Sequence, residues 1–321
     1  MSQRRISIMM AALILMLLQT GTVFANEIHW SYDGDTGPAY WGELSPDWAL
    51  CGSGESQSPI DIPSSAASNP ADLMPIYGPS ALTIFNNGHT VQVNYDAGST
   101  LELDGETYEL LQFHFHASSE HTVNGVARPM EMHLVHANED GDLAVVGVFL
   151  EEGADNAVFA PIFDNMPAEE SEPEAVADVM VNADDLLPTT QTYWRYSGSL
   201  TTPNCAENVK WVVMNTPVEV GADQIGTYTA IYDHNARPTQ PMNDRAFMVG
   251  PQMEEPAMEE PAMEEPATEE PATEEPAMEE PDMLPETGGP ASDVLNLAAV
   301  AGVLMLLGGA TSVSAYRRRL Q

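Results

Sequence analysis

The stretch "YELLQFHFH", Tyr108 to His116, decides the fold. Its aromatic and apolar residues, ending in two histidines, are typical of a buried β-strand. Successive side chains of a strand point to opposite faces, so His114 and His116 share one face and Phe113 and Phe115 share the other. We expect the phenylalanines to bury their face, so that the two imidazoles keep a fixed aim.

Runs of the same kind recur along the chain and predict a large, mainly antiparallel sheet. Asn87-Gly88, Asp104-Gly105 and Asp140-Gly141 are turn signals between strands. Helix signals are few, and residues 156–166 and 222–233 are each expected to give a short helix. The other predicted strands lie within residues 82–95, 100–105, 130–138, 143–150 and 209–215.

A third histidine can complete a metal site. His133 lies 17 residues after His116, which leaves room for a turn and a return on a neighbouring strand. On spacing alone, His121 and His136 compete with His133 for this role. Three neutral histidines with an open fourth position describe a catalytic zinc site, whereas a structural zinc site has four ligands. His-x-His by itself is equally consistent with an ordinary strand.

Residues 1–25 resemble a secretory signal peptide. Arg4 and Arg5 precede an apolar run, and Val23-Phe24-Ala25 fits a cleavage site, so we place the mature start at Asn26. An uncleaved membrane anchor is the alternative. Export permits a disulfide, and the mature chain has exactly two cysteines, Cys51 and Cys205, which can form one bridge. Two buried free thiols are the other interpretation.

The C-terminal part has a different composition. Residues 251–283 repeat Glu-Glu-Pro six times. Proline at this spacing excludes a continuous helix and like charges repel, so we interpret the repeat as a disordered, extended stalk. A metal-binding acidic tail is the alternative. One folded domain is therefore expected over residues 26–250.

Residues 284–321 have three parts in order: "LPETGG", an uncharged span (294–316), and Arg317 to Arg319. The span is long enough to cross a bilayer as a transmembrane helix, with the arginines on the cytoplasmic side. This order resembles the sorting signal of surface proteins processed by sortases. The resemblance implies cleavage between Thr287 and Gly288 and transfer to a cell-surface acceptor. A plain C-terminal membrane anchor is the alternative.

The charge of the domain excludes one class of partner. Residues 26–250 contain five basic and 34 acidic residues. A net charge of about −29 argues against binding of nucleic acid, because the phosphate backbone is itself an anion.

Nine motifs in order make residues 28–247 similar to the α-class carbonic anhydrases. They are "SPI", "NNGHTVQV", "QFHFH", "SEHTV", "EMHLVHAN", "LAVVGVFLEEG", "YWRYSGSLTTPNC", "VKWVV" and "NARPTQP". The resemblance implies a central twisted, mostly antiparallel sheet with few helices and Zn²⁺ at the base of a conical cleft. It implies reversible hydration of carbon dioxide to bicarbonate and a proton, by attack of zinc-bound hydroxide.

The resemblance also implies roles for individual residues. His114, His116 and His133 match the zinc ligands, and Gln112, Glu131 and the main-chain carbonyl of Asn235 match the partners of their outward ring nitrogens. His121 and His136 match supporting histidines. Cys51 and Cys205 match the bridge of exported members.

Further matches concern the reacting groups. Thr201 matches the threonine that accepts from the hydroxide and donates to Glu120, and His89 matches the proton shuttle. The remaining matches are the apolar wall for carbon dioxide (Val135, Val145, Leu200 and Trp211), a polar contact for bicarbonate (Thr202), and the residues that order water (Tyr32, Asn87 and Gln92).

Two other functions remain open from the sequence. The same hydroxide could hydrolyse activated esters, and the fold could serve a non-catalytic surface-binding protein. The sequence does not exclude a homodimer. The expected location is the cell surface, with the domain anchored through its C-terminus.

Overall fold

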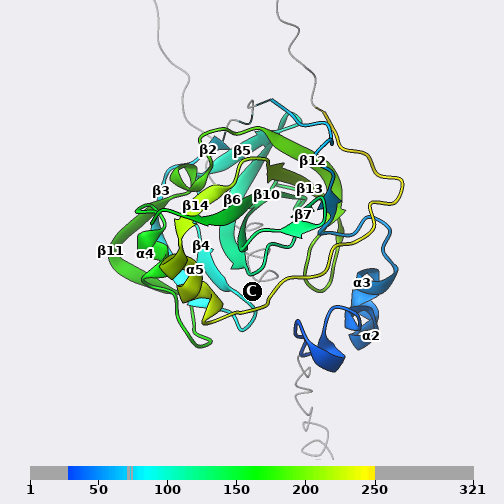
Figure 1. Ribbon diagram of the computed structural model, residues 1–321, viewed down its shortest axis with the longest axis horizontal. Helices are drawn as coiled ribbons and strands as arrows, with labels where there is room; N and C mark the ends of the chain where they lie inside the picture. Colours follow the sequence, from blue (N-terminus) through cyan, green and yellow to red (C-terminus); the bar gives the residue numbers. More distant parts are fainter. Residues whose placement is uncertain (1–27, 71–72, 74, 250–321) are drawn as a thin grey trace, which may run out of the picture. The chain divides into compact units, whose positions relative to one another are not determined.

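The computed structural model describes residues 28–70, 73 and 75–249 (Figure 1). The predicted signal peptide (1–25), repeat (251–283) and sorting signal (284–321) lie outside these residues. Within the described part of the chain, no helix is long and apolar enough to cross a membrane.

A large twisted sheet dominates the domain (Figure 1). The strand order across the sheet is β11-β3-β4-β6-β9-β10-β13-β12. In addition, β14 pairs with β10, and β5 pairs with both β2 and β6. The strands are β2 (Pro75–Ile76), β3 (Pro79–Asn86), β4 (Val91–Asn94), β5 (Thr100–Leu103), β6 (Glu106–His116), β9 (Met130–Ala137), β10 (Leu143–Gly153), β11 (Glu174–Asn182), β12 (Tyr193–Ser199), β13 (Glu207–Met214) and β14 (Val218–Gly221).

The expected fold class is confirmed. Most neighbouring strands of the large sheet are antiparallel, and only β10 with β13 and β10 with β14 run parallel. A small second sheet contains β1 (Asp61–Ile62), β7 (Thr122–Val123) and β8 (Val126–Ala127). At the Asp104-Gly105 turn between β5 and β6 both residues have positive φ, which a two-residue hairpin of this type requires.

Helices are short, as expected, but two of the four α-helices in the described residues lie before residue 54, where no helix was predicted. The α-helices are α2 (Trp41–Leu44), α3 (Leu50–Ser53), α4 (Ala160–Phe163) and α5 (Ala222–Thr229), and the 3₁₀ turns are η1 (Gly34–Thr36), η2 (Pro46–Trp48) and η3 (Ala183–Leu186). Phe163 of α4 and Tyr228 of α5 pack into the same core as Phe115 of β6. The two helices therefore cover the face of the sheet that the phenylalanines bury.

An irregularity in β6 sets which side chains face this core. The register between β6 and β9 shifts between Leu110 and Gln112. Before the shift, Tyr108 and Leu110 point into the core with α4 and α5; after it, Phe113 and Phe115 do. One extra residue in a strand reverses the faces of all that follow. The shift therefore moves His114 and His116 to the opposite face, where a second core contains Val135 and Trp211.

The disulfide prediction is confirmed. Cys51 of α3 and Cys205 in the loop between β12 and β13 form a bridge with an S–S distance of 2.05 Å. Trp41 packs against the bridge, with Trp30, Tyr32 and Trp48 partly buried around it. The bridge therefore fixes the N-terminal segment to the loop that carries Thr201.

His136 gives a pH-dependent prediction. The imidazole is fully buried between the Tyr77 hydroxyl (2.7 Å from Nε2) and the Ala144 carbonyl (3.2 Å from Nδ1). Burial lowers the pKa of His136 to about 4 in the folded state, against about 6.5 in an unfolded chain. The unfolded state therefore binds the proton first, and stability that is complete above pH 6.5 is lost as the pH falls to about 4.

We expect His136 to account for about 3 kcal/mol of this loss, at about 1.4 kcal/mol per pKa unit. Urea unfolding at pH 7.5 and pH 4.5 measures it, with His136→Gln as the matched variant. The free energy of unfolding should fall less steeply with acid in the variant; equal slopes would contradict the assignment.

Candidate metal centre

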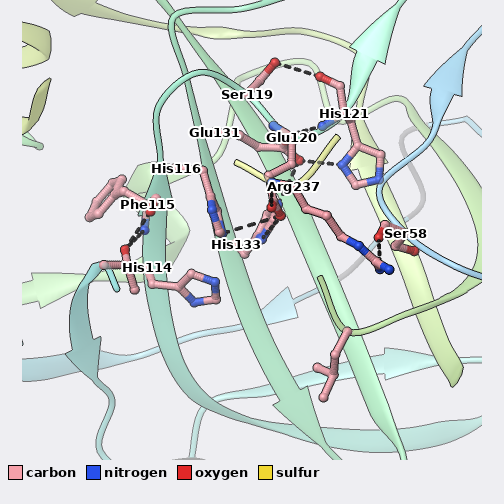
Figure 2. A network of polar contacts seen from close by, with 12 residues as sticks. Ser58, His114, Phe115, His116, Ser119, Glu120, His121, Glu131, His133 and Arg237 are labelled. Atoms are coloured by element: carbon pink, nitrogen blue, oxygen red, sulfur yellow. Dashed lines mark hydrogen bonds and ion pairs between the residues drawn. The ribbon is translucent and has the colours of Figure 1, made fainter. Parts of the chain in front are cut away.

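Three histidines gather on the face of β6 and β9 opposite the phenylalanines (Figure 2). His114 and His133 are direct cross-strand partners, and His116 lies two residues further along β6. One ligand nitrogen from each ring lies within 4.8 Å of the other two. This set is the only one in the described residues that combines three histidines, and it is the arrangement of a three-histidine metal site.

Each of these rings has one nitrogen engaged with an acceptor. His114 Nδ1 donates to Gln112 Oε1 (2.8 Å), and His116 Nδ1 donates to the Asn235 carbonyl (2.7 Å). His133 Nε2 donates to Glu131 Oε1 (2.9 Å). Such contacts fix the tautomer and the orientation of a ligand ring. They leave the lone pairs of His114 Nε2, His116 Nε2 and His133 Nδ1 available to one ion.

Two of the histidines have a lowered pKa, which favours the neutral form of the imidazole that binds metals. Burial, reinforced by the neighbouring rings of His116 and His133, lowers the pKa of His114 well below its usual value. Burial also lowers the pKa of His116, although the carboxylate of Glu120 opposes this shift. Both rings are therefore neutral near pH 7 and can bind a cation without releasing a proton.

Glu131 lies at the centre of a buried hydrogen-bond network (Figure 2). Its Oε1 accepts from His133 and from His121 Nδ1 (2.7 Å), while its Oε2 accepts from the backbone N–H groups of Glu120 and His121. Burial alone would raise the pKa of Glu131, but the imidazoles of His121 and His133 hold it well below its ordinary value. The carboxylate is therefore a permanent acceptor.

This network excludes a second metal at His121, Glu131 and His133, although these three side chains are also close together. The ring nitrogens that face Glu131 donate protons to it and have no lone pair free for an ion. Gly147, opposite His133 on β10, leaves space for the carboxylate, since a Cβ there would lie 2.9 Å from Glu131 Oε1.

Glu120 has one satisfied and one unsatisfied oxygen. Oε1 accepts from the backbone N–H of Arg237 (2.8 Å). Oε2 lies 3.6 Å from His116 Nε2, and both of these buried atoms have no hydrogen-bond partner among the described residues. Buried polar atoms are rarely left unpaired, so this pair fits a site that receives a cation with its bound water. Neutral nitrogen donors next to a carboxylate suit Zn²⁺.

Thr201 lies in the loop between β12 and β13 and is 6% exposed. Thr201 and Glu120 both lie among the described residues, but no hydrogen bond joins the Thr201 hydroxyl to the Glu120 carboxylate. The backbone N–H of Cys205 donates to the carbonyl of Thr202 (2.8 Å), which closes the loop beside the disulfide.

An apolar surface adjoins the histidines. Val145 pairs with Val135 on one side and with Trp211 on the other, so three strands place these side chains in a row. Leu200 packs against the same cluster. The Trp211 ring lies 4.9 Å from the His133 ring, so the apolar row reaches the candidate metal centre.

His89 follows the Asn87-Gly88 turn and stacks on Trp30, with ring centroids 3.7 Å apart. Burial, with a smaller effect of His29, lowers the pKa of His89 to about 4. Asn87 Oδ1 accepts from the backbone N–H groups of His89 and Thr90, and its Nδ2 lies 3.4 Å from Gln92 Oε1.

Tyr32 contacts the Trp30 ring edge to face. Burial, together with the charge of Glu120, raises the pKa of its hydroxyl well above the usual value. The hydroxyl therefore stays protonated and can donate a hydrogen bond.

Sequence reasoning gave no role to two residues that the structure places at the site. Arg237 supplies the N–H for Glu120, and its guanidinium donates to the carbonyls of Ser58 and Cys51. Trp30 supplies the surface on which His89 stacks. The "NARPTQP" motif contained the signal for Arg237, because an arginine beside a buried asparagine needs internal acceptors; Trp30 had no comparable signal.

Comparisons with known proteins agree with this geometry. Residues 36–249 match the family described as eukaryotic-type carbonic anhydrase. The chain is 46% identical over 231 residues to a carbonic anhydrase of Nostoc sp., covering 70% of this chain and 88% of that protein. It is 43% identical to the carbonic anhydrase of Pectobacterium atrosepticum, covering 69% of this chain and 91% of that protein.

A solved structure gives the same result. The α-carbonic anhydrase from Thermovibrio ammonificans, in complex with the inhibitor sulfanilamide, superposes with a TM-score of 0.66 at 41% identity, covering 69% of this chain and 99% of that chain. The chain belongs to the eukaryotic-type, or α-class, carbonic anhydrase family. It is therefore an enzyme, a carbonic anhydrase whose substrates are carbon dioxide and bicarbonate.

Proposed function

We propose that this enzyme hydrates carbon dioxide reversibly with Zn²⁺ bound by His114, His116 and His133. The observation that supports this most strongly is the set of outward contacts. Gln112, Asn235 and Glu131 each engage the ring nitrogen that faces away from the site. When bound, zinc supplies Lewis acidity that makes water a nucleophile near neutral pH.

Glu120 and Thr201 orient the reacting water in this proposal. Glu120 Oε2 has no partner among the described residues and can accept the single proton of the Thr201 hydroxyl. Thr201 Oγ1 can then only accept from the water, which aims an oxygen lone pair at the substrate. Arg237 fixes the other carboxylate oxygen, so that Glu120 cannot rotate away.

The apolar row is the resting place of carbon dioxide. Val135, Val145 and Trp211 are at most 5% exposed and adjoin the ligand histidines, with Leu200 beside them. A neutral, weakly hydrated molecule loses little by leaving water for such a surface, and Thr202 offers bicarbonate a polar contact.

His89 exports the proton that each hydration releases. Tyr32, Asn87 and Gln92 would order the water between His89 and the metal centre. With a pKa of about 4 in the stacked position, His89 releases its proton readily there. It binds a proton near neutral pH only when its ring leaves Trp30 for water, where a histidine pKa is about 6.5.

A variant tests this relay. In His89→Ala, turnover in dilute buffer should fall by about 100-fold, the lower end of the contribution of a general acid–base group. Added imidazole should restore it, because the free base replaces the missing side chain. Stopped-flow carbon dioxide hydration over a range of imidazole concentrations measures the effect, and wild-type turnover without rescue would remove His89 from the mechanism.

The proposed function as a whole is tested on one purified sample. Zinc content, carbon dioxide hydration and hydrolysis of an activated ester are measured together. One zinc per chain with hydration far faster than ester hydrolysis supports the proposal. Zinc with ester hydrolysis alone would indicate an esterase, and absence of both zinc and hydration would contradict the mechanism.

We also propose that the enzyme acts at the cell surface. The signal-peptide pattern of residues 1–25, the repeat of residues 251–283 and the LPETG sorting pattern support this proposal. Mass spectrometry of the surface-bound protein should find a mature start at Asn26 and a C-terminus at Thr287. A chain that ends at Gln321 would favour a plain membrane anchor.

A further inference from the structure

The segment Asn235–Arg237 follows α5 and is almost fully buried, although it belongs to no helix or strand. It begins the "NARPTQP" motif. The role given to Asn235 so far uses only its main-chain carbonyl, which accepts from His116. Its side chain is 0% exposed and makes a separate set of contacts.

The Asn235 amide joins two parts of the site. Its Oδ1 accepts from the backbone N–H of Ala117 (2.8 Å), while the main-chain N–H of Asn235 donates to the Ala117 carbonyl (2.9 Å). Its Nδ2 lies 3.1 Å from the carbonyls of both Phe115 and His89, and 2.8 Å from the Tyr228 hydroxyl. The two protons of Nδ2 are therefore shared among three acceptors, which lie on β6, on the turn that carries His89 and on α5.

The end of a strand pair explains why an amide is needed here. The pairing of β4 with β6 extends from Gln112 to His114. Beyond His114 lie the carbonyl of Phe115 and the N–H of Ala117, and buried backbone groups need partners. The N–H of Ala117 donates to Asn235 Oδ1, while the carbonyl of Phe115 accepts from the hydroxyls of Thr90 and Tyr228 as well as from Asn235 Nδ2. Asparagine supplies one acceptor and two donors in a single side chain.

The consequence for His116 is geometric. Asn235 contacts the backbone of the residue before His116, the backbone of the residue after it, and its ring through Nδ1. The ring is therefore fixed together with the strand that carries it. His116 Nε2, which has no hydrogen-bond partner among the described residues, is aimed by these contacts.

The same amide anchors His89. Nδ2 contacts the His89 carbonyl, and the hydroxyl of the next residue, Thr90, donates to the Phe115 carbonyl (2.6 Å). The turn that carries His89 is thus attached to β6 directly beside His116.

We infer that the side chain of Asn235 is a positioning group that couples the aim of His116 to the placement of His89. Metal retention and proton export then depend on one buried amide. The inference rests on the proposed function, in which His116 binds zinc and His89 exports the proton. A purely structural asparagine would affect stability without linking these two properties.

Asn235→Ala tests the coupling, because alanine keeps both main-chain contacts and removes the amide. The first measurement is the rate at which a chromogenic chelator withdraws zinc from the purified full chain. We expect this rate to rise about 10-fold, the lower end of the effect of losing a partner of a metal ligand. The second is turnover against imidazole concentration, where we expect a loss in dilute buffer that imidazole rescues.

Tyr228→Phe is the matched control, because it removes one hydroxyl from the same network and keeps the Asn235 contacts with Ala117, Phe115 and His89. Its zinc release and buffer dependence should equal those of the wild type. If Asn235→Ala does not fold, Asn235→Asp replaces it. The aspartate has the same shape and keeps the acceptor for Ala117 but not the amide donor, so the imidazole rescue should persist.

The outcomes separate the two levels of the proposal. A wild-type chain without zinc, or His89→Ala without buffer dependence, would contradict the proposed function. If both behave as expected, wild-type zinc release or wild-type buffer dependence in a folded Asn235 variant would show that the coupling is wrong.

Discussion

Replacing His114 by alanine is expected to remove zinc from the purified protein and to reduce carbon dioxide hydration to the uncatalysed rate. His114 Nε2 is one of three nitrogens that converge on the site, and two histidines alone leave an ion mostly bound to water. Loss of a supporting partner costs roughly 10-fold to 100-fold in metal affinity, so loss of a ligand should cost more. Metal analysis and stopped-flow hydration measure both effects.

Two variants bracket this result. Gln112→Ala removes only the acceptor of His114 Nδ1, so it should retain zinc with weaker affinity and lose part of the activity. His136→Gln changes a buried histidine of β9 that contacts Tyr77 and not the site, so it should keep its zinc. A His114→Ala protein with full zinc and wild-type turnover would refute the assignment of the ligands.

Removing the Cys51–Cys205 bridge is expected to lower the free energy of unfolding by about 5 kcal/mol. The bridge joins residues 154 apart in the sequence, and in the chain-entropy model a loop of that length restricts the unfolded state by this amount. Guanidinium unfolding of the Cys51→Ala/Cys205→Ala double variant measures the loss. Such a loss is a large part of the stability of an ordinary domain.

A reductant provides the control for this prediction. Reduced wild type should unfold at the same denaturant concentration as the double variant, and the reductant should leave the double variant unchanged. A double variant within about 1 kcal/mol of the oxidised wild type would mean that the bridge contributes little and that the packing of Trp41 fixes the N-terminal segment.

The part of the fold that sequence alone could predict is the part where alternation is regular. "QFHFH" lies wholly beyond the shift at Leu111, so a period of two placed His114 and Phe115 on the correct faces. Applied to the whole of β6, the same rule would have put His114 on the face of Tyr108. Alternation predicts relative orientation within a regular run, and a bulge resets it.

Strand β11 shows the opposite case. It lies at the edge of the sheet, and its register with β3 shifts between Ala175 and Met180. An edge strand whose pairing is interrupted does not show a regular alternation of apolar and polar residues, so its sequence does not identify it as a strand. The sequence therefore predicted the central strands and not this one.

The site divides in a similar way. Spacing alone predicted that His114 and His116 share one face of a strand. It did not distinguish His121, His133 and His136 as candidates for the third metal ligand. Only the register of β6 with β9, which sets His133 opposite His114, distinguishes them. The main-chain carbonyl of Asn235 came from the family resemblance alone, and the contacts of the Asn235 side chain and of Arg237 were not predicted. These contacts join residues more than a hundred positions apart through irregular backbone, which spacing does not reveal.

This separation along the chain has a consequence for the order of assembly. His114 and His133 meet as soon as β6 pairs with β9. These two strands are close together in the sequence, so their pairing costs only the entropy of closing a short loop. The acceptors for His116 and Glu120 arrive only when residues 235 and 237, 119 and 117 positions away from their partners, pack against β6. Long-range contacts form late in folding, so in the proposed zinc site a newly made chain should first bind the ion loosely, with three histidines of which His116 still lacks its acceptor. The ion should be bound tightly only after the C-terminal part of the domain has packed against β6.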